Sequence, residues 1–113
     1  MTTTPAYAIA ELRDVDLGEE IIDYIERIDA TLAPYGGHFL VHGGPVHAVE
    51  GEWPGDIVII AFPDRDAALA WYDSPAYQAI LPLRTEHSDS RAAVLTGLPP
   101  GYRAVDKLTT LLA

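Results

Sequence analysis

The sequence predicts an α+β domain of βαββαβ order, in which a four-stranded antiparallel sheet carries helices on one face. Apolar residues alternate with the period of a strand in four segments, and they recur with the period of a helix in the segments between. The third strand, residues 57–62, is apolar on both faces, which is typical of a central strand covered on both sides. Because the helices cover only one face, we expect a second copy to cover the other and form a symmetric homodimer.

The first strand and the first helix are predicted within residues 7–32. Residues 7–12 alternate well enough for a strand. Asp16 and Glu19 form an Asp-led capping box, which predicts that a helix starts there. Its buried stripe consists of residues at helical spacing: Ile21, Ile25, Ile28 and Leu32. Pro34 and the two glycines that follow Tyr35 end this helix.

The second strand is predicted at residues 38–42. The Gly-Gly-Pro segment at residues 43–45 then bends or bulges the chain. The strand could resume over residues 46–49 before a Gly/Pro-containing loop leads into the third strand.

The second half of the domain is predicted to hold two short helices and the fourth strand. Asp64 caps a helix over residues 67–73, whose inward stripe is Ala68, Leu69 and Tyr72. Ser74 caps a further helix over residues 76–81, and Pro82 ends it. Residues 91–96 form the fourth strand. Residues 102–113 can form an amphipathic helix, or a strand if they pair with a neighbour.

The composition excludes several classes of partner. A net charge of −10 repels phosphate backbones and anionic membrane surfaces, so we expect neither nucleic acid nor a membrane as partner. The chain has no Cys, which excludes thiolate nucleophiles and thiolate metal sites. The first ten residues contain no Lys or Arg and no long apolar run, so we expect a cytoplasmic protein without a secretory signal. An RNA-recognition domain shares the element order but needs exposed aromatic and basic residues on the sheet, which the apolar third strand does not offer.

Five segments resemble the domain-of-unknown-function family DUF1330, of the dimeric α/β-barrel superfamily. They are residues 35–44 (YGGHFLVHGG), 50–53 (EGEW), 57–63 (IVIIAFP), 70–78 (AWYDSPAYQ) and 83–84 (LR). The resemblance covers roughly residues 5–97 and implies a ferredoxin-like subunit whose dimer closes two sheets into a barrel, but no particular activity. It gives a domain at residues 1–97 and a C-terminal extension, residues 98–113, that packs on the domain or on the partner subunit. Where the family usually carries Arg, this chain has His38 and His42.

His38 and His42 are the candidate catalytic residues. Both are expected on the same face of the second strand, toward the barrel interior, with Glu11 nearby if the register permits. They can act as an acid/base pair or bind a polar ligand; alternatively they are histidines of the interface or its rim. Four strand residues separate their Cα atoms by about 13 Å, whereas two imidazoles on one ion bridge only about 11 Å. We therefore expect no metal shared within one subunit, and no cofactor.

Five further residues are candidates for binding a ligand: Trp53, Trp71, Tyr72, Tyr77 and Arg84. The aromatic residues near the helix break at Ser74 can line a pocket between helix and sheet, or belong to the ordinary core. Trp53 lies in a loop and either closes that pocket or covers the sheet edge. Arg84 can hold a carboxylate ligand through two hydrogen bonds, or pair with a local acid such as Glu86 or Asp89.

These residues favour a small-molecule-binding homodimer with one pocket per subunit. It is either a cofactor-independent enzyme that uses acid/base catalysis on a small organic acid or ketone, or a non-catalytic binding or assembly module. In the enzyme, His38 or His42 moves the proton and Arg84 or Tyr77 orients the ligand. Haem-degrading monooxygenases of the superfamily use an Asn-Trp-His set, and their chemistry is not expected because the chain contains no Asn.

Overall fold

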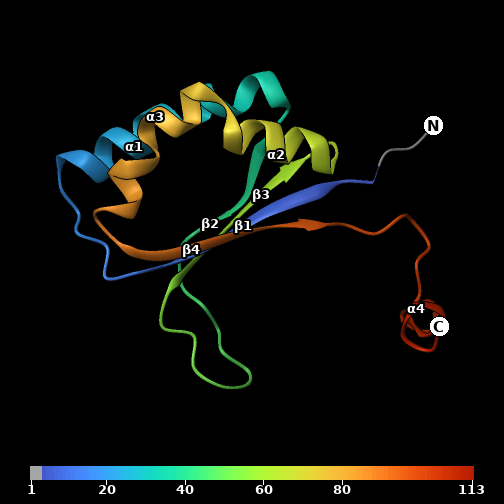
Figure 1. The fold of residues 1–113 in the computed structure, drawn as a ribbon. Helices are drawn as coiled ribbons and strands as arrows, with labels where there is room; N and C mark the ends of the chain where they lie inside the picture. The colour runs from blue at the N-terminus through green and yellow to red at the C-terminus, as the bar shows by residue number, and fades with distance from the viewer. Residues whose placement is uncertain (1–3) are drawn as a thin grey trace.

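The computed structural model describes residues 4–113 and shows the predicted element order, with one antiparallel sheet in the order β2-β3-β1-β4. The elements are β1 (Ala6–Arg13), α1 (Glu19–Leu32), η1 (Ala33–Tyr35), β2 (His38–His42), β3 (Asp56–Phe62), α2 (Arg65–Asp73), α3 (Pro75–Thr85), β4 (Asp89–Thr96), η2 (Ala104–Asp106) and α4 (Lys107–Leu111). The helices α1, α2 and α3 cover one face of the sheet (Figure 1). The predicted fold and the central place of the third strand are confirmed, whereas residues 46–49 belong to a loop and not to a strand.

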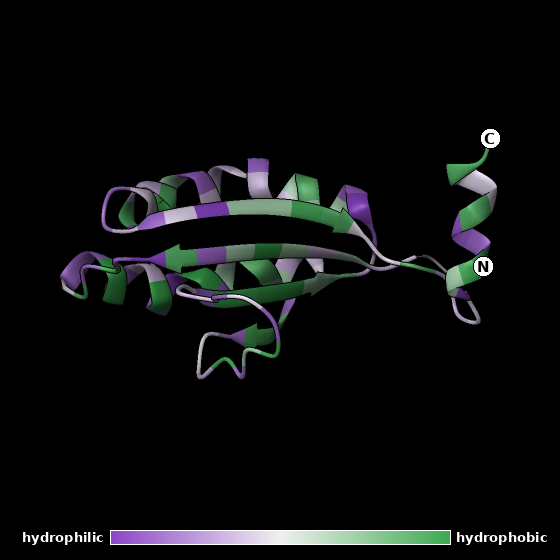
Figure 2. Cartoon of the chain, turned by 90° about the horizontal axis from the view of Figure 1, so that it is seen from below, coloured by the Kyte–Doolittle hydropathy of each residue, from purple (hydrophilic) through white to green (hydrophobic). Residues whose placement is uncertain are grey.

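The opposite face of the sheet, called the bare face below, has no cover within the single chain. Ile59 of β3 points to it and pairs with Ile9 of β1 and Val41 of β2. Val41 and Leu95, which also face this side, are 40% and 51% exposed. Figure 2 views the chain from this side and shows hydrophobic residues recurring along the strands. The bare face therefore has an apolar centre that water contacts in the isolated chain.

α1 begins at Glu19 with Gly18 as its N-cap, and no side chain caps it. The prediction that Asp16 caps this helix is wrong, because the Asp16 N–H donates to the His87 carbonyl at 2.8 Å and ties the preceding loop to the end of α3. Ile21 is buried as predicted, whereas Ile25 is 45% exposed; both residues line the cavity described below.

The predicted caps of α2 and α3 are confirmed. The Ala67 N–H donates to Asp64 Oδ1 at 2.8 Å, and the Tyr77 N–H donates to Ser74 Oγ at 3.2 Å. Each cap satisfies one backbone donor that the first turn leaves free. The two helices therefore meet at Ser74, as the sequence indicates.

Pro82 does not end α3, contrary to the prediction. The helix continues to Thr85, and the Glu86 N–H donates to the Pro82 carbonyl at 2.9 Å. In a helix interior, proline lacks an N–H donor and its ring crowds the carbonyl four residues earlier, at a cost of about 3 kcal/mol. The buried residues of α3 lie both before and after Pro82 and hold the helix in place across it. They are Tyr77, Ile80 and Arg84.

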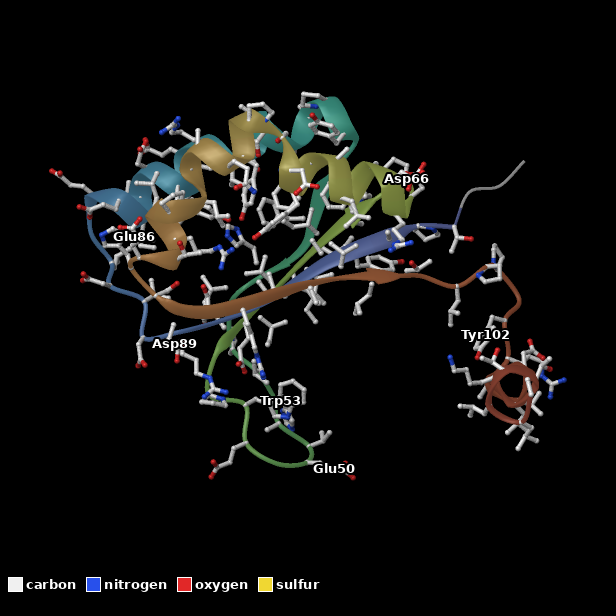
Figure 3. All side chains as sticks on the ribbon, in the orientation of Figure 1. Glu50, Trp53, Asp66, Glu86, Asp89 and Tyr102 are labelled. Atoms are coloured by element: carbon white, nitrogen blue, oxygen red, sulfur yellow. The ribbon has the colours of Figure 1, made fainter. Side chains whose placement is uncertain are left out.

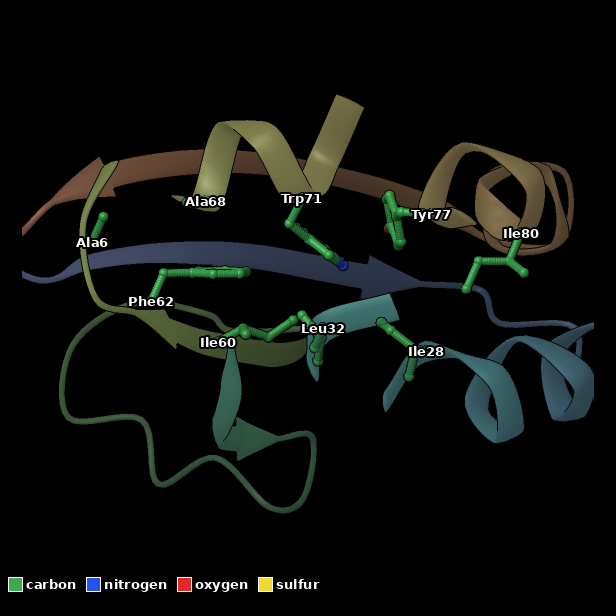
Figure 4. Packing of buried hydrophobic residues seen from close by; sticks show 9 residues of the cluster. All are labelled: Ala6, Ile28, Leu32, Ile60, Phe62, Ala68, Trp71, Tyr77 and Ile80. Atoms are coloured by element: carbon green, nitrogen blue, oxygen red, sulfur yellow. The ribbon is translucent and has the colours of Figure 1, made fainter. Parts of the chain in front are cut away.

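The core lies between the helices and the sheet (Figure 4) and consists of Ala6, Ile28, Leu32, Ile60, Phe62, Ala68, Trp71, Tyr77 and Ile80. The Trp71 ring packs against Phe62 with ring centroids 5.4 Å apart, and its indole N–H donates to Thr31 Oγ1 at 2.9 Å. α2 thus buries Ala68 and Trp71, whereas Leu69, predicted to face inward, is 37% exposed.

The chain leaves the domain after β4. The Gly97 N–H donates to the Pro5 carbonyl at 2.7 Å, and residues 98–113 then run away from the sheet and the helices (Figure 1). Residues 103–113 are all exposed. The predicted C-terminal helix is present as the short α4, and it does not pack on its own domain.

Candidate functional site

A cavity of about 670 Å³ lies between the helix layer and the sheet. This volume is typical of small-molecule sites. Ala8 and Ala10 on the helix-facing side of β1 leave room beneath the helices, and Val58 and Ile60 of β3 extend the apolar floor. Most of the lining is apolar, and the polar side chains that reach it are Tyr24, His42, Asp56, Arg65, Tyr72, Tyr77 and Arg84.

Two tyrosine hydroxyls meet in this cavity. Tyr24 of α1 and Tyr77 of α3 place their oxygens 2.7 Å apart, with the rings edge to face. Burial, and then the neighbouring Tyr77 phenol, raise the pKa of Tyr24 well above its ordinary value. Tyr24 therefore remains a protonated hydroxyl across the neutral pH range, and either phenol of the pair can be the donor.

Arg84 is buried in the cavity wall without an acidic partner. Its residue is only 5% exposed, and its Nη1 donates to Ser90 Oγ at 2.6 Å. The alternative of an ion pair with Glu86 or Asp89 is not realised, since none of the ion pairs among residues 4–113 involves Arg84. Burial lowers the pKa of Arg84, but the phenols of Tyr77 and Tyr24 together raise it by more. The guanidinium is therefore a buried, permanent cation.

The two candidate histidines lie on opposite faces of the sheet, and the prediction of a shared face is wrong. The register of β2 against β3 shifts at Leu40, so that His38 pairs with Ala61 while His42 pairs with Val58. One extra residue in a strand turns every later side chain to the other face. His38 therefore belongs to the bare face, and His42 to the cavity.

His42 stacks on Phe39 at a centroid separation of 4.4 Å and lines the cavity. Glu11 is not close to His38 in register, because it pairs with Ile57, at the other end of β3 from the partner of His38. Glu11 Oε1 instead lies 3.1 Å from Arg13 Nη2 on the bare face. The predicted grouping of Glu11 with both histidines does not form within one chain.

Among the aromatic candidates, Trp71, Tyr72 and Tyr77 all line the cavity. Trp71 and Tyr77 are also part of the core, with ring centroids 4.1 Å apart, so they build the wall that shapes the cavity. Trp53 lies elsewhere. It is 54% exposed in the loop on the bare-face side (Figure 3), where its indole N–H donates to the Glu50 carbonyl at 3.0 Å. Trp53 does not close the cavity of its own chain.

Sequence reasoning missed Tyr24 and Ser90 as members of the site. Tyr24 lies three residues after Ile21 and four before Ile28, on the buried stripe of α1, and this spacing is the signal that could have identified it. Ser90 had no such signal, since only the packing of α3 on β4 brings it to Arg84.

Two kinds of site have no support in residues 4–113. No three His, Asp or Glu side chains come together in a way that could hold a metal ion. Within the same residues, no helix combines the length and the apolar character that crossing a bilayer requires.

The profile of the family DUF1330, described as a domain of unknown function, matches residues 5–98. Among solved structures, a dimeric ferredoxin-like protein of unknown function from Thermobifida fusca is similar at a TM-score of 0.60 and 18% identity, covering 85% of this chain and 93% of that one. SnoaB, a cofactor-independent oxygenase from Streptomyces nogalater, is similar at 0.59 and 15%, covering 89% and 100%. A protein of unknown function from Rhodopseudomonas palustris is similar at 0.59 and 19%, covering 86% and 85%. At these identities the structures establish the ferredoxin-like fold, and no curated protein matches the chain significantly.

Proposed function

The chain belongs to the DUF1330 family of domains of unknown function, and we propose that its cavity binds a small, mostly apolar organic acid or ketone. In this proposal an oxygen of the ligand accepts hydrogen bonds from Arg84 and from the Tyr24–Tyr77 pair. The protein acts as a homodimer whose subunits each contain one such cavity. The same fold in SnoaB belongs to a cofactor-independent oxygenase, which is an example of small-molecule chemistry in this architecture.

The observation that carries the proposal is the buried guanidinium of Arg84, which has no carboxylate partner. Removing an unpaired charge from water costs several kcal/mol, so such a group is retained where something else compensates it. A guanidinium has five N–H donors; Arg84 donates one hydrogen bond to Ser90 and lies beside the phenols of Tyr77 and Tyr24, none of which carries a charge that balances its own. An anionic or strongly polarised oxygen in the cavity would compensate the charge and take up the remaining donors.

The Tyr24–Tyr77 pair narrows the class of ligand further. The phenols share one hydrogen bond, so one donates its proton to the other, whose own proton stays free to donate elsewhere. Arg84 can only donate. This end of the cavity therefore favours an acceptor oxygen, as in a carboxylate or a carbonyl, over an amine.

Acid/base catalysis in this proposal is assigned to His42, which lines the cavity. An imidazole can take a proton from the carbon next to a carbonyl near neutral pH. The donors at Arg84 and at the Tyr24–Tyr77 pair would stabilise the negative charge that then develops on the carbonyl oxygen. His38 remains the second candidate, but from the bare face it could act only on a ligand held between the two sheets of a dimer and not on one in this cavity. The alternative function is a non-catalytic binding or assembly module.

The binding test begins with a thermal-shift screen of aryl and alicyclic carboxylates and ketones, each paired with an amine of the same shape. We expect carboxylates and ketones to raise the melting temperature and the amines not to. Calorimetry then compares the wild type with Arg84→Gln and with Arg91→Gln, an arginine on the bare face. Arg84→Gln should weaken carboxylate binding by about tenfold or more, while Arg91→Gln should not. Equal affinity in both variants would overturn the proposal.

The catalytic test uses a ketone found in this screen. Nuclear magnetic resonance measures how fast the hydrogens next to its carbonyl exchange with deuterated water. We expect the wild type to accelerate the exchange, His42→Ala to lose the acceleration and His38→Ala to retain it. Tight binding with exchange at the protein-free rate would favour the non-catalytic binding module.

A further inference from the structure

The C-terminal arm, defined as residues 98–113, projects to the side of the sheet opposite the helices. Figure 1 shows α4 beyond the end of β4 on the side of the bare face, where the loop of residues 43–55 also projects. The last backbone hydrogen bond that ties the chain to the domain before the arm is Gly97 N–H to the Pro5 carbonyl. The arm therefore borders the space that a molecule on the bare face would occupy.

The arm has an apolar stripe that its own domain leaves uncovered. Val105, Leu108 and Leu112 follow helical spacing, and they are 51%, 46% and 80% exposed. α4 is only five residues long, and a helix of this length is not stable in water without packing against something else. The arm thus needs a surface from outside its own chain.

The net side-chain charge of the arm differs in sign from that of the domain. Residues 98–113 carry two cations, Arg103 and Lys107, and one acid, Asp106, whereas residues 1–97 carry 16 acids and five cations. Two acidic domains that approach each other repel. A basic, apolar arm complements the acidic surface of another copy of the same domain.

We infer that the C-terminal arm clasps the second copy of this chain that covers the bare face, with Leu108 and its apolar neighbours packed on that copy. The inference rests on the homodimer of the proposed function. The DUF1330 match ends at residue 98, so the clasp is an addition to the family domain. It holds the two copies together after their sheets have met, and each copy contributes one arm.

Sedimentation equilibrium tests the clasp on four proteins: the full chain, a chain that ends at Gly97, Leu108→Asp/Leu112→Asp, and the control Thr109→Asp/Thr110→Asp. The control adds the same charge to neighbouring exposed residues of α4. We expect truncation and the leucine pair to weaken the dimer by about tenfold or more, and the control to change it little. Dimers of unchanged strength in the truncated chain would overturn the clasp but leave the homodimer standing. A full chain that is monomeric would contradict both the clasp and the homodimer.

A photocrosslink identifies what the arm contacts. Because the chain has no Cys, Leu108→Cys gives a single attachment point for a benzophenone maleimide. Illumination should give a covalent dimer on a denaturing gel, whereas the same probe at Gln78→Cys, an exposed position on the helix layer, should not. Crosslinks that join the arm only to its own chain, or equal dimer yields from both positions, would contradict the inference.

Discussion

Arg84 combines burial with an unmatched charge, and this combination predicts a trade between binding and stability. Replacing Arg84 with Met removes a buried cation while keeping an unbranched side chain of similar length in the wall of the cavity. We expect the free energy of unfolding without ligand to stay the same or to rise by up to about 2 kcal/mol. The carboxylate binding that we propose should be lost. Urea unfolding and calorimetry measure the two effects, and a clear loss of stability would instead make the Ser90 contact the main role of Arg84.

The raised pKa of Tyr24 predicts that the folded protein loses stability at alkaline pH. Burial and the Tyr77 phenol raise its pKa in the folded protein above the ordinary value of about 10. The unfolded chain releases this proton first, so the contribution of Tyr24 to stability is complete below about pH 10 and declines as the pH rises further. Urea unfolding at about pH 8 and about pH 10.5 measures this effect. Between these two pH values, the free energy of unfolding should fall less in Tyr24→Phe than in the wild type. Tyr102→Phe, a substitution in residues 98–113, is the control, and its free energy of unfolding should fall by as much as that of the wild type.

The histidines show why residue-level prediction of the site was incomplete. Strict alternation placed His38 and His42 on one face, but the extra residue at Leu40 separates them. The sequence does contain a bulge signal, the Gly-Gly-Pro at residues 43–45, yet the irregularity falls earlier in the strand. Arg84 was identified from its chemistry alone. Whether it pairs with an acid or stays unpaired depends on how α3 packs on β4, which local sequence does not specify.

Just before β2, the backbone of Gly37 lies so close to core side chains that only glycine fits there. A Cβ on Gly37 would lie 2.7 Å from Phe62 Cε1 and 2.9 Å from Leu32 Cδ2, both in the core. We expect Gly37→Ala to lower the free energy of unfolding by about 1–3 kcal/mol through overpacking. Gly51→Ala is the control, since its Cβ meets open space and adds only the strain of a positive φ. Chemical denaturation that finds Gly37→Ala no worse than Gly51→Ala would contradict this account.

The sequence predicts a helix end correctly where a side chain caps the backbone. It fails where contacts with distant parts of the chain determine the position of the end. Asp64 and Ser74 cap as the sequence indicates, because an N-cap is a local interaction. Asp16 is drawn away by the carbonyl of His87, and α3 passes through Pro82 because residues on both sides of it are buried. Both differences come from contacts between segments far apart in the chain, or from burial, and neither is encoded in the local pattern.

At the scale of the whole molecule, the pattern of β3 predicted the architecture. A strand that is apolar on both faces must be central, and it lies between β2 and β1. Its helix-facing residues enter the core, while Ile59 on the other side is left on the bare face. The cavity could not be predicted in the same way. It depends on small residues of β1 lying opposite α1 and α3, and this arrangement is a property of the packed helix layer.

The exposed apolar residues of the bare face predict that two copies of the chain associate through it. Ile59→Asp places a charge at the centre of this face, where it is hydrated in a single chain but desolvated between two sheets. We therefore expect Ile59→Asp to be a folded monomer by circular dichroism and sedimentation. Ile22→Asp is the matched control, because Ile22 is 47% exposed on α1, on the other side of the molecule, and this variant should still form the proposed homodimer. If Ile59→Asp associates as strongly as Ile22→Asp, the sheets do not meet through the bare face, and the copies must associate through another surface.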